Sequence, residues 1–143
     1  MRRSRVAAAS MAGSTLGTIV RITTKSSDET TKNATGDVLT DKPLVVLVNG
    51  NTSSSAEVIA ASLKDNERAT IVGTNTLGKG SVQVTHELTF GGALRYTAAY
   101  YKSPLDHDLD GLGINPDISI GRPDDEDNQK SLAMETAQSM VRE

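Results

Sequence analysis

An uninterrupted apolar run, Pro43-Leu-Val-Val-Leu-Val-Asn49, leads directly into a turn and then a helical pattern over 56–64. The run is short and rich in Val, which is typical of a strand buried on both faces in a layered protein. A second run of this kind, Ala69-Thr-Ile-Val-Gly73, follows the predicted helix. A buried strand, a helix and another buried strand in this order predict an α/β fold.

The remaining segments predict further strands, a polar loop and a terminal helix. Residues 25–42 are rich in Ser, Asp, Thr, Lys and Asn, and we expect a flexible, solvated loop there. The other predicted elements are a short helix over 4–12, strands over 16–24, 82–90, 93–101 and 118–120, and a tight hairpin turn at Gly91-Gly92. We expect one core over 1–122, followed over 123–143 by an acidic linker and an amphipathic helix.

The composition excludes several kinds of site. The 143-residue chain has no cysteine, so disulfides, thiolate metal sites and a cysteine nucleophile are excluded together. Lys and Arg number 15 against 18 for Asp and Glu, so no basic surplus indicates nucleic-acid binding. No run approaches the ~18 apolar residues of a membrane span. The basic start, Met1–Arg5, precedes an apolar stretch that is too short and weak to predict a signal peptide.

The turn after the first buried strand, N-G-N-T-S-S-S-A-E over 49–57, concentrates serines at a helix start. The first N–H groups of a helix have no intrahelical partner, and the helix dipole favours negative charge there. Ser54 is a candidate nucleophile at this position, and the backbone N–H of Ser55 can stabilise an oxyanion. Ser54 and Glu57 also have the S-x-x-E spacing of a capping box, so the local pattern leaves a structural cap as the alternative.

A nucleophilic serine needs a base, and the chain offers two histidines and several lysines. His86 lies in a predicted strand and His107 in an Asp-rich loop, where either is an ordinary surface residue. Lys79 stands between Gly78 and Gly80, which let the backbone pack closely and aim the side chain inward. A lysine acts as a base only where its surroundings lower its pKa from ~10.4 toward the working pH. The alternative for Lys79 is an ordinary solvated loop lysine.

Five blocks in the stretch from Pro43 to Ile120 together resemble the catalytic core of the C-terminal processing (tail-specific) peptidases. The blocks are P-L-V-V-L-V-N at 43–49, S-S-A-E at 54–57, A-T-I-V-G at 69–73, L-G-K-G-S-V-Q at 77–83 and G-L-G-I-N-P-D at 111–117. The resemblance implies part of a ClpP/crotonase-like core, an α/β fold of stacked strands with helices. Residues 1–122 would then be the C-terminal part of a peptidase catalytic core.

The resemblance also implies a set of roles for site residues. Ser54 aligns with the nucleophile of the family and Lys79 with its general base, while Gln83 aligns with the glutamine that orients this lysine. Ser55 supplies one oxyanion N–H. Such a serine–lysine dyad cleaves protein C-terminal tails, often unfolded, through an acyl-enzyme and needs no metal or other cofactor. Enzymes of this family work in the periplasm or cell envelope, so the resemblance implies an extracytoplasmic location.

The chain departs from the family pattern at the serine turn, in the upstream segment, and at Leu77, where Phe is more common. Ser53 and Ser55 stand where alanine is usual, and Ala56 stands where serine is usual. With three adjacent serines, the assignment of the nucleophile is ambiguous by one position. The upstream D-L-R-x-N-x-G-G segment, which supplies the second oxyanion donor, and the PDZ domain are absent from the sequence. We therefore expect the C-terminal part of a longer enzyme or a degenerate copy. The alternative function is a non-catalytic ligand- or peptide-binding module on the same fold, and homo-oligomerisation stays open.

Two other motifs are partial. Gly73-Thr-Asn-Thr-Leu-Gly78-Lys79 matches the first part of a P-loop, but Gly80 stands where Ser or Thr must hold magnesium. The loop from Asp106 to Asp117 has the aspartate spacing of an EF-hand but lacks the closing glutamate. These departures argue against nucleotide binding and favour an acidic surface loop over a weak calcium site.

Overall fold

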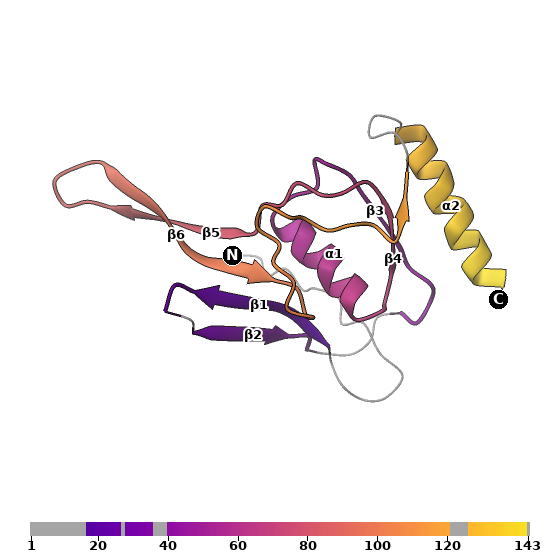
Figure 1. Ribbon diagram of the computed structural model, residues 1–143, viewed down its shortest axis with the longest axis horizontal. Coiled ribbons are helices and arrows are strands. Elements are labelled where there is room, and N and C mark those ends of the chain that lie inside the picture. The colour runs from indigo at the N-terminus through magenta and orange to yellow at the C-terminus, as the bar shows by residue number, and fades with distance from the viewer. Residues whose placement is uncertain (1–16, 27, 36–39, 121–125, 143) are drawn as a thin grey trace.

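The computed structural model describes residues 17–26, 28–35, 40–120 and 126–142. Within these residues the chain forms seven strands in two sheets and two helices, with one helix between the sheets and the other on the far side of the second sheet (Figure 1). The arrangement is the predicted α/β class. The helix predicted over 4–12 and most of the acidic linker lie outside the described residues.

The smaller sheet is parallel and contains the two apolar runs. Its order is β3-β4-β7, formed by Val45–Val48, Thr70–Gly73 and Ile118–Ser119. Helix α1 (Ser55–Asp65) connects β3 to β4, as the strand–helix–strand pattern predicts. Burial on both faces is incomplete, because the Leu47 side chain is 39% exposed. The carboxyl ends of β3 and β4 lie side by side, since Val48 pairs with Gly73.

The larger sheet is antiparallel and has the order β2-β1-β6-β5. Strands β5 (Ser81–Glu87) and β6 (Ala93–Lys102) form the predicted hairpin, which projects far from the body of the molecule (Figure 1). The hairpin loop is longer than the predicted two-residue turn. It spans 88–92, with the Gly91 N–H donating to the Leu88 carbonyl oxygen at 3.0 Å.

The prediction of a loop over residues 25–42 is wrong in part. Its residues Glu29–Asn33 form strand β2, which pairs antiparallel with β1 (Thr18–Thr24). Every β2 side chain is exposed, so the apolar alternation that normally marks a strand is missing. The strand is held through its backbone at the edge of the sheet, where β-branched residues such as Thr30 and Thr31 suit an extended conformation.

Helix α1 packs between the two sheets and contributes much of a small aliphatic core. The core residues are Val48, Ala60, Ala61, Ile71, Leu109 and Ile114. Helix α2 (Glu126–Arg142) covers the other face of β3 and β4, where the Met140 sulfur lies 3.8 Å from the Thr70 hydroxyl oxygen. No helix among the described residues is long and apolar enough to cross a membrane.

The carboxyl end of α1 is tied to both neighbouring elements. The Asn66 side-chain amide donates to the Thr18 carbonyl oxygen at 2.8 Å and to the Ser62 carbonyl oxygen at 2.7 Å. Asp65 accepts hydrogen bonds from the Leu105 N–H, at 2.9 Å, and from the Ser103 hydroxyl. Since α1 is held at this end, the position of its first turn is fixed relative to both sheets.

Candidate active site

Ser54 lies at the sharp turn between β3 and α1, at the carboxyl end of the parallel sheet. It is the N-cap of α1, with φ 57° and ψ −122°. A positive φ is strained for a residue with a Cβ, and such strain concentrates at functional sites. The Ser54 side chain is half-buried and makes no capping hydrogen bond. The Glu57 N–H donates instead to the Ser54 carbonyl oxygen, at 2.9 Å.

Glu57 lies one turn into α1, and its side chain is completely buried. Its carboxylate accepts four hydrogen bonds from described neighbours. Oε1 accepts from the Thr76 hydroxyl at 2.5 Å and from the Gly78 N–H at 2.6 Å. Oε2 accepts from the N–H groups of Ser54 and Lys79, both at 2.8 Å. These donors satisfy a carboxylate that would otherwise be costly to bury.

This carboxylate brings the two candidate catalytic residues together. The backbone nitrogens of Ser54 and Lys79 bond to the same oxygen atom, so they are separated by no more than twice 2.8 Å. The S-x-x-E spacing predicts only the bond that the Ser54 N–H donates to the Glu57 carboxylate. The bonds to the loop over 76–79 come from tertiary structure, and the sequence signal that could have indicated them is a Gly-rich loop with unpaired N–H groups after the neighbouring strand.

The backbone around Lys79 packs as closely as its flanking glycines predict. Gly78 has φ 82°, and a Cβ on Gly80 would lie 2.3 Å from the Asp110 nitrogen. The Lys79 side chain, however, is exposed rather than aimed inward. Among the described residues its Nζ donates no hydrogen bond. The structure therefore brings the Lys79 backbone to the serine turn and leaves its side chain accessible.

The other two predicted site residues differ in their surroundings. The Gln83 side chain is exposed on β5, and its amide donates to the Thr97 hydroxyl at 2.5 Å rather than to Lys79. Ser55 is the first residue of α1 and is exposed. Its N–H has no hydrogen-bond acceptor within the described chain, which leaves this donor available at the helix start.

The segment over 109–114 packs against the Gly-rich loop over 73–80. The Thr76 hydroxyl, which donates to Glu57, also accepts the Ile114 N–H at 2.8 Å. The Asn75 amide donates to the Leu112 carbonyl oxygen at 3.0 Å. A Cβ on Gly113 would lie 2.4 Å from the Thr76 carbonyl oxygen. The Gly111 N–H also donates to the Gly78 carbonyl oxygen at 2.8 Å, so the sequence blocks at 77–83 and 111–117 lie against each other beside the serine turn.

The same hydrogen bonds explain why the loop over 73–80 is not a phosphate-binding loop. A P-loop uses free backbone N–H groups to hold phosphate. In this loop the N–H groups of Gly78 and Lys79 donate to Glu57, and that of Gly80 donates to Asp110 at 3.1 Å. The N–H of Leu77 donates to the Thr52 carbonyl oxygen at 3.0 Å. These donors already have partners within the protein.

The aspartates of the EF-hand-like loop pair with protein groups instead of converging. Asp106 and Asp108 lie 3.0 Å and 3.8 Å from the Lys102 ammonium. The hydrogen bond that the Lys102 ammonium donates to Asp106 raises the pKa of Lys102. Asp110 accepts from Gly80, and Asp117 pairs with Lys64 at 2.8 Å. Over the described residues, no three acidic or histidine side chains are grouped as metal ligands.

A pocket of about 220 Å³ lies next to the serine turn, where β3 ends against the first turns of α2. Its lining residues are Leu47, Val48, Asn49, Thr52, Gln129 and Lys130. Thr52 connects the pocket to the candidate site, because its carbonyl oxygen accepts the Leu77 N–H. Clefts at the carboxyl ends of parallel strands are common ligand positions in α/β proteins.

Known proteins are similar to this chain in sequence and fold. The carboxyl-terminal-processing protease of Synechocystis sp. is 43% identical over 106 residues, which are 74% of this chain and 25% of that protein. The chloroplastic carboxyl-terminal-processing peptidase 3 of Arabidopsis thaliana is 48% identical over 58% of this chain and 16% of its own length. The solved photosystem II D1 C-terminal processing protease superimposes with a TM-score of 0.72 at 35% identity, covering 76% of this chain and 28% of that one.

The chain thus spans about a quarter or less of the length of these relatives. The family profile of Peptidase family S41 matches residues 4–120, which are most of the chain. The expected resemblance and the expected fold are both confirmed by these matches. The chain belongs to peptidase family S41, and several of its relatives are named carboxyl-terminal-processing proteases.

Proposed function

We propose that this chain carries the serine–lysine dyad of an endopeptidase that cleaves protein C-terminal tails, with Ser54 as nucleophile and Lys79 as general base. The observation that supports this assignment most strongly is the buried Glu57 carboxylate, which binds the backbone of both residues through one oxygen atom. The strained backbone of Ser54 supports the same choice among the three adjacent serines, because Ser53 and Ser55 have no positive φ.

The mechanism follows from the positions of these groups. Neutral Lys79 takes the proton from the Ser54 hydroxyl as Oγ attacks the scissile carbonyl carbon. The carbonyl oxygen becomes an oxyanion, which the free N–H of Ser55 stabilises at the start of α1. The protonated lysine then gives its proton to the leaving amine, so that an acyl-enzyme remains on Ser54. Water activated by the same lysine hydrolyses this ester.

The exposed Lys79 side chain sets a condition for this mechanism. An ammonium group cannot act as a base, and desolvation is what favours the neutral form of lysine. A bound polypeptide, or the further core segment that S41 peptidases have, would cover Lys79 and supply that desolvation. We also propose that Gln83 exchanges its bond with Thr97 for one with Lys79 when the site is covered, and so orients the amine.

The substrates we propose are unfolded protein tails, outside the cytoplasm. The names of the relatives specify carboxyl-terminal processing, and the Arabidopsis relative is described as chloroplastic. The proposed reaction transfers an acyl group to serine and then to water, and it uses no metal or other cofactor.

A cleavage assay tests the proposal. The chain is joined to the upstream core segment and PDZ domain of an S41 peptidase and incubated with an unfolded protein that has a free carboxyl terminus. We expect cleavage near that terminus, and loss of about 100-fold or more in kcat/KM in both Ser54→Ala and Lys79→Ala. Lys32→Ala, on the exposed strand β2, is the matched control. Unchanged cleavage in either dyad variant contradicts the proposal.

A further inference from the structure

The strand that follows Lys79 has an edge with no partner among the described strands. In the larger sheet, β5 is the outermost strand, and β6 is its sole partner among the described strands. Figure 1 shows β5 on the outer side of the projecting hairpin, with its first residues beside the start of α1. A long exposed edge strand is a template for pairing with another chain, and proteins normally blunt or cover it.

The register identifies which backbone groups lie on this edge. Hydrogen-bonded and non-hydrogen-bonded pairs alternate along antiparallel strands. Near the hairpin loop the Leu88 N–H donates to the Gly92 carbonyl oxygen at 3.1 Å, so the backbone groups of Leu88 face β6. At the other end the Tyr101 N–H donates to the Gly80 carbonyl oxygen at 2.7 Å, so those of Gly80 face β6 as well.

Counting from either end gives the same result. The residues whose N–H and C=O groups face away from β6 are Ser81, Gln83, Thr85 and Glu87. None of these N–H groups has a hydrogen-bond acceptor among the residues that the structure describes. This row of unpaired donors and acceptors begins two residues after Lys79, whose own N–H shares the Glu57 oxygen with Ser54. An extended chain on the β5 edge therefore leads directly to the candidate nucleophile.

We propose that the substrate polypeptide binds by adding a strand to the free edge of β5, through the backbone groups of Ser81, Gln83 and Thr85. This inference rests on the proposed function, because it takes the polypeptide bound there to be the one cleaved at Ser54. Strand addition obtains its affinity from main-chain hydrogen bonds, which every unfolded tail can form. A folded protein whose backbone groups are already paired cannot supply them, so this edge favours unfolded substrates.

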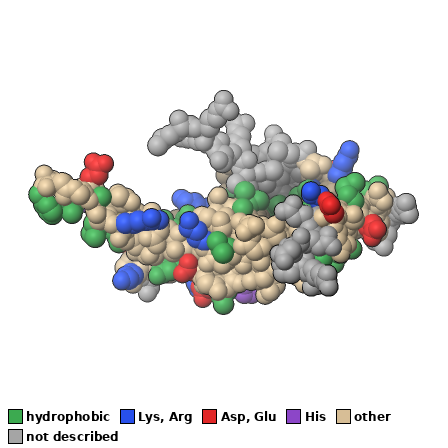
Figure 2. All heavy atoms as spheres, turned by 90° about the horizontal axis from the view of Figure 1, so that it is seen from above, with side chains coloured by type: hydrophobic (Ala, Val, Ile, Leu, Met, Phe, Trp, Pro, Cys, Tyr) green, Lys and Arg blue, Asp and Glu red, His purple; other side chains and the backbone are tan. Residues whose placement is uncertain are grey.

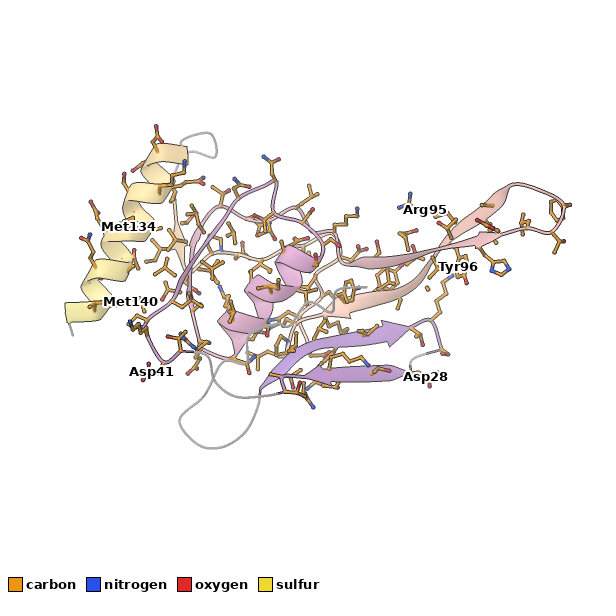
Figure 3. All side chains as sticks on the ribbon, turned by 180° about the vertical axis from the view of Figure 1, so that it is seen from behind. Asp28, Asp41, Arg95, Tyr96, Met134 and Met140 are labelled. Carbon is orange, nitrogen blue, oxygen red and sulfur yellow. The ribbon has the colours of Figure 1, made fainter. Side chains whose placement is uncertain are left out.

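The two faces of the hairpin give this site a side-chain preference. One face carries Val84 and its β6 partner Tyr96, followed by His86 and its partner Leu94. The Leu94 and Tyr96 side chains are 54% and 47% exposed. The opposite face carries Thr85 and Arg95. Figure 3 shows Arg95 and Tyr96 on opposite sides of β6, and Figure 2 shows hydrophobic side chains gathered at the far end of the hairpin. Because side chains of an added strand also alternate, the edge favours alternating apolar and polar residues.

Amide hydrogen exchange in the Ser54→Ala chain tests this site. The probe is a short unstructured peptide with alternating Val and Thr and a free carboxylate. We expect it to slow exchange at the N–H groups of Gln83 and Thr85, with little change at Val84 and His86, which already face β6. Saturating peptide that leaves the exchange of Gln83 and Thr85 unchanged overturns the proposal.

Two matched comparisons separate strand addition from other binding. Thr85→Pro removes an outward N–H without removing a β5–β6 hydrogen bond, whereas Thr85→Ala keeps that N–H. We expect Thr85→Pro to weaken peptide binding about two- to tenfold relative to Thr85→Ala, the loss that one backbone hydrogen bond predicts. Equal binding by the two variants overturns the proposal.

The second comparison leaves the protein unchanged, so it does not depend on the folding of a proline variant. Two peptides are N-methylated on alternate amides, one on the odd and the other on the even positions. Strand addition predicts that one of them loses binding and the other keeps it; equal binding overturns the proposal. Peptide binding at the β5 edge without cleavage would support the edge site and contradict the proposed peptidase function. Cleavage without slower exchange at the β5 edge would contradict only the proposal of strand addition.

Discussion

One carboxylate organises the candidate site at the scale of single residues. Glu57 is buried, and each of its oxygens accepts two hydrogen bonds, which together come from the serine turn and from the loop before β5. A residue of this kind does not touch the substrate. It holds the two residues proposed to do so, because neither the Ser54 nor the Lys79 backbone can move without breaking a bond to it.

Replacing Glu57 by Gln tests this role. One acceptor oxygen becomes an NH₂ group that faces N–H donors, so at least one buried donor loses its acceptor. We expect the free energy of unfolding to fall by about 2–3 kcal/mol, measured by urea denaturation. Glu67→Gln, at the exposed end of α1, is the matched control and should change stability by less than about 0.5 kcal/mol. Equal effects of the two substitutions would show that Glu57 is an ordinary helix residue.

The strained backbone of Ser54 makes a separate prediction. Glycine adopts φ 57° without the steric cost that a Cβ imposes, whereas alanine retains that cost. We expect Ser54→Gly to be more stable than Ser54→Ala by about 1 kcal/mol, despite the greater entropy of glycine in the unfolded chain. Urea denaturation of the two variants measures the difference. A Ser54→Ala variant as stable as Ser54→Gly would show that the turn carries no strain.

The sequence predicts the identity of the candidate site residues better than their surroundings. Ser54 and Lys79 follow from five short blocks whose order and spacing match a family. The second role of Glu57 depends on hydrogen bonds to residues about twenty positions away, and local patterns carry no information about such contacts. The bond from Gln83 to Thr97 is unpredictable for the same reason, since it depends on the register of the hairpin.

At the scale of elements, close packing of two loops holds the Gly-rich segment in place. A Cβ on Gly80 would meet backbone atoms of Leu109 and Asp110 at 2.7 Å and 2.3 Å. Backbone atoms cannot rotate away as a flexible side chain can. Gly80→Ala must therefore separate the loop that carries Lys79 from its support.

We expect Gly80→Ala to lower the free energy of unfolding by about 1–3 kcal/mol, the usual cost of overpacking. Gly50→Ala provides the control, because a Cβ there would have its nearest neighbour, the Asn75 carbonyl oxygen, at 4.0 Å. Thermal unfolding of the two variants distinguishes the sites. If Gly80→Ala unfolds at the same temperature as Gly50→Ala, the two loops are not packed as described.

The elements themselves were predictable to different degrees. Continuous Val-rich runs indicate β3 and β4, and the hairpin is marked by alternating residues on both sides of Gly91-Gly92. Strand β2 was missed because it buries no side chain and is held by backbone pairing with β1. An edge strand of this kind can be recognised only from its backbone pairing with the neighbouring strand, which a sequence pattern does not show.

For the whole molecule, the described layers match only a part of the peptidases that the chain resembles. The relatives are about four or more times as long as the segments they share with this chain. The proposed nucleophile, base and first oxyanion donor lie on this part, and we propose that an upstream segment supplies the second oxyanion donor. We expect the chain joined to that segment to exceed the chain alone by about 100-fold or more in kcat/KM, because one oxyanion donor contributes that much. Equal kcat/KM values would show that this part of the core forms a complete oxyanion site.

The most direct test of the central assignment is covalent labelling of the serine turn. The joined protein is treated with a fluorophosphonate, which reacts with activated serines, and the modified residue is identified by peptide mapping. We predict modification of Ser54, at a rate that falls by about 100-fold or more in Lys79→Ala. Modification of Ser53 or Ser55 instead, or an unchanged rate in Lys79→Ala, would contradict the proposed dyad.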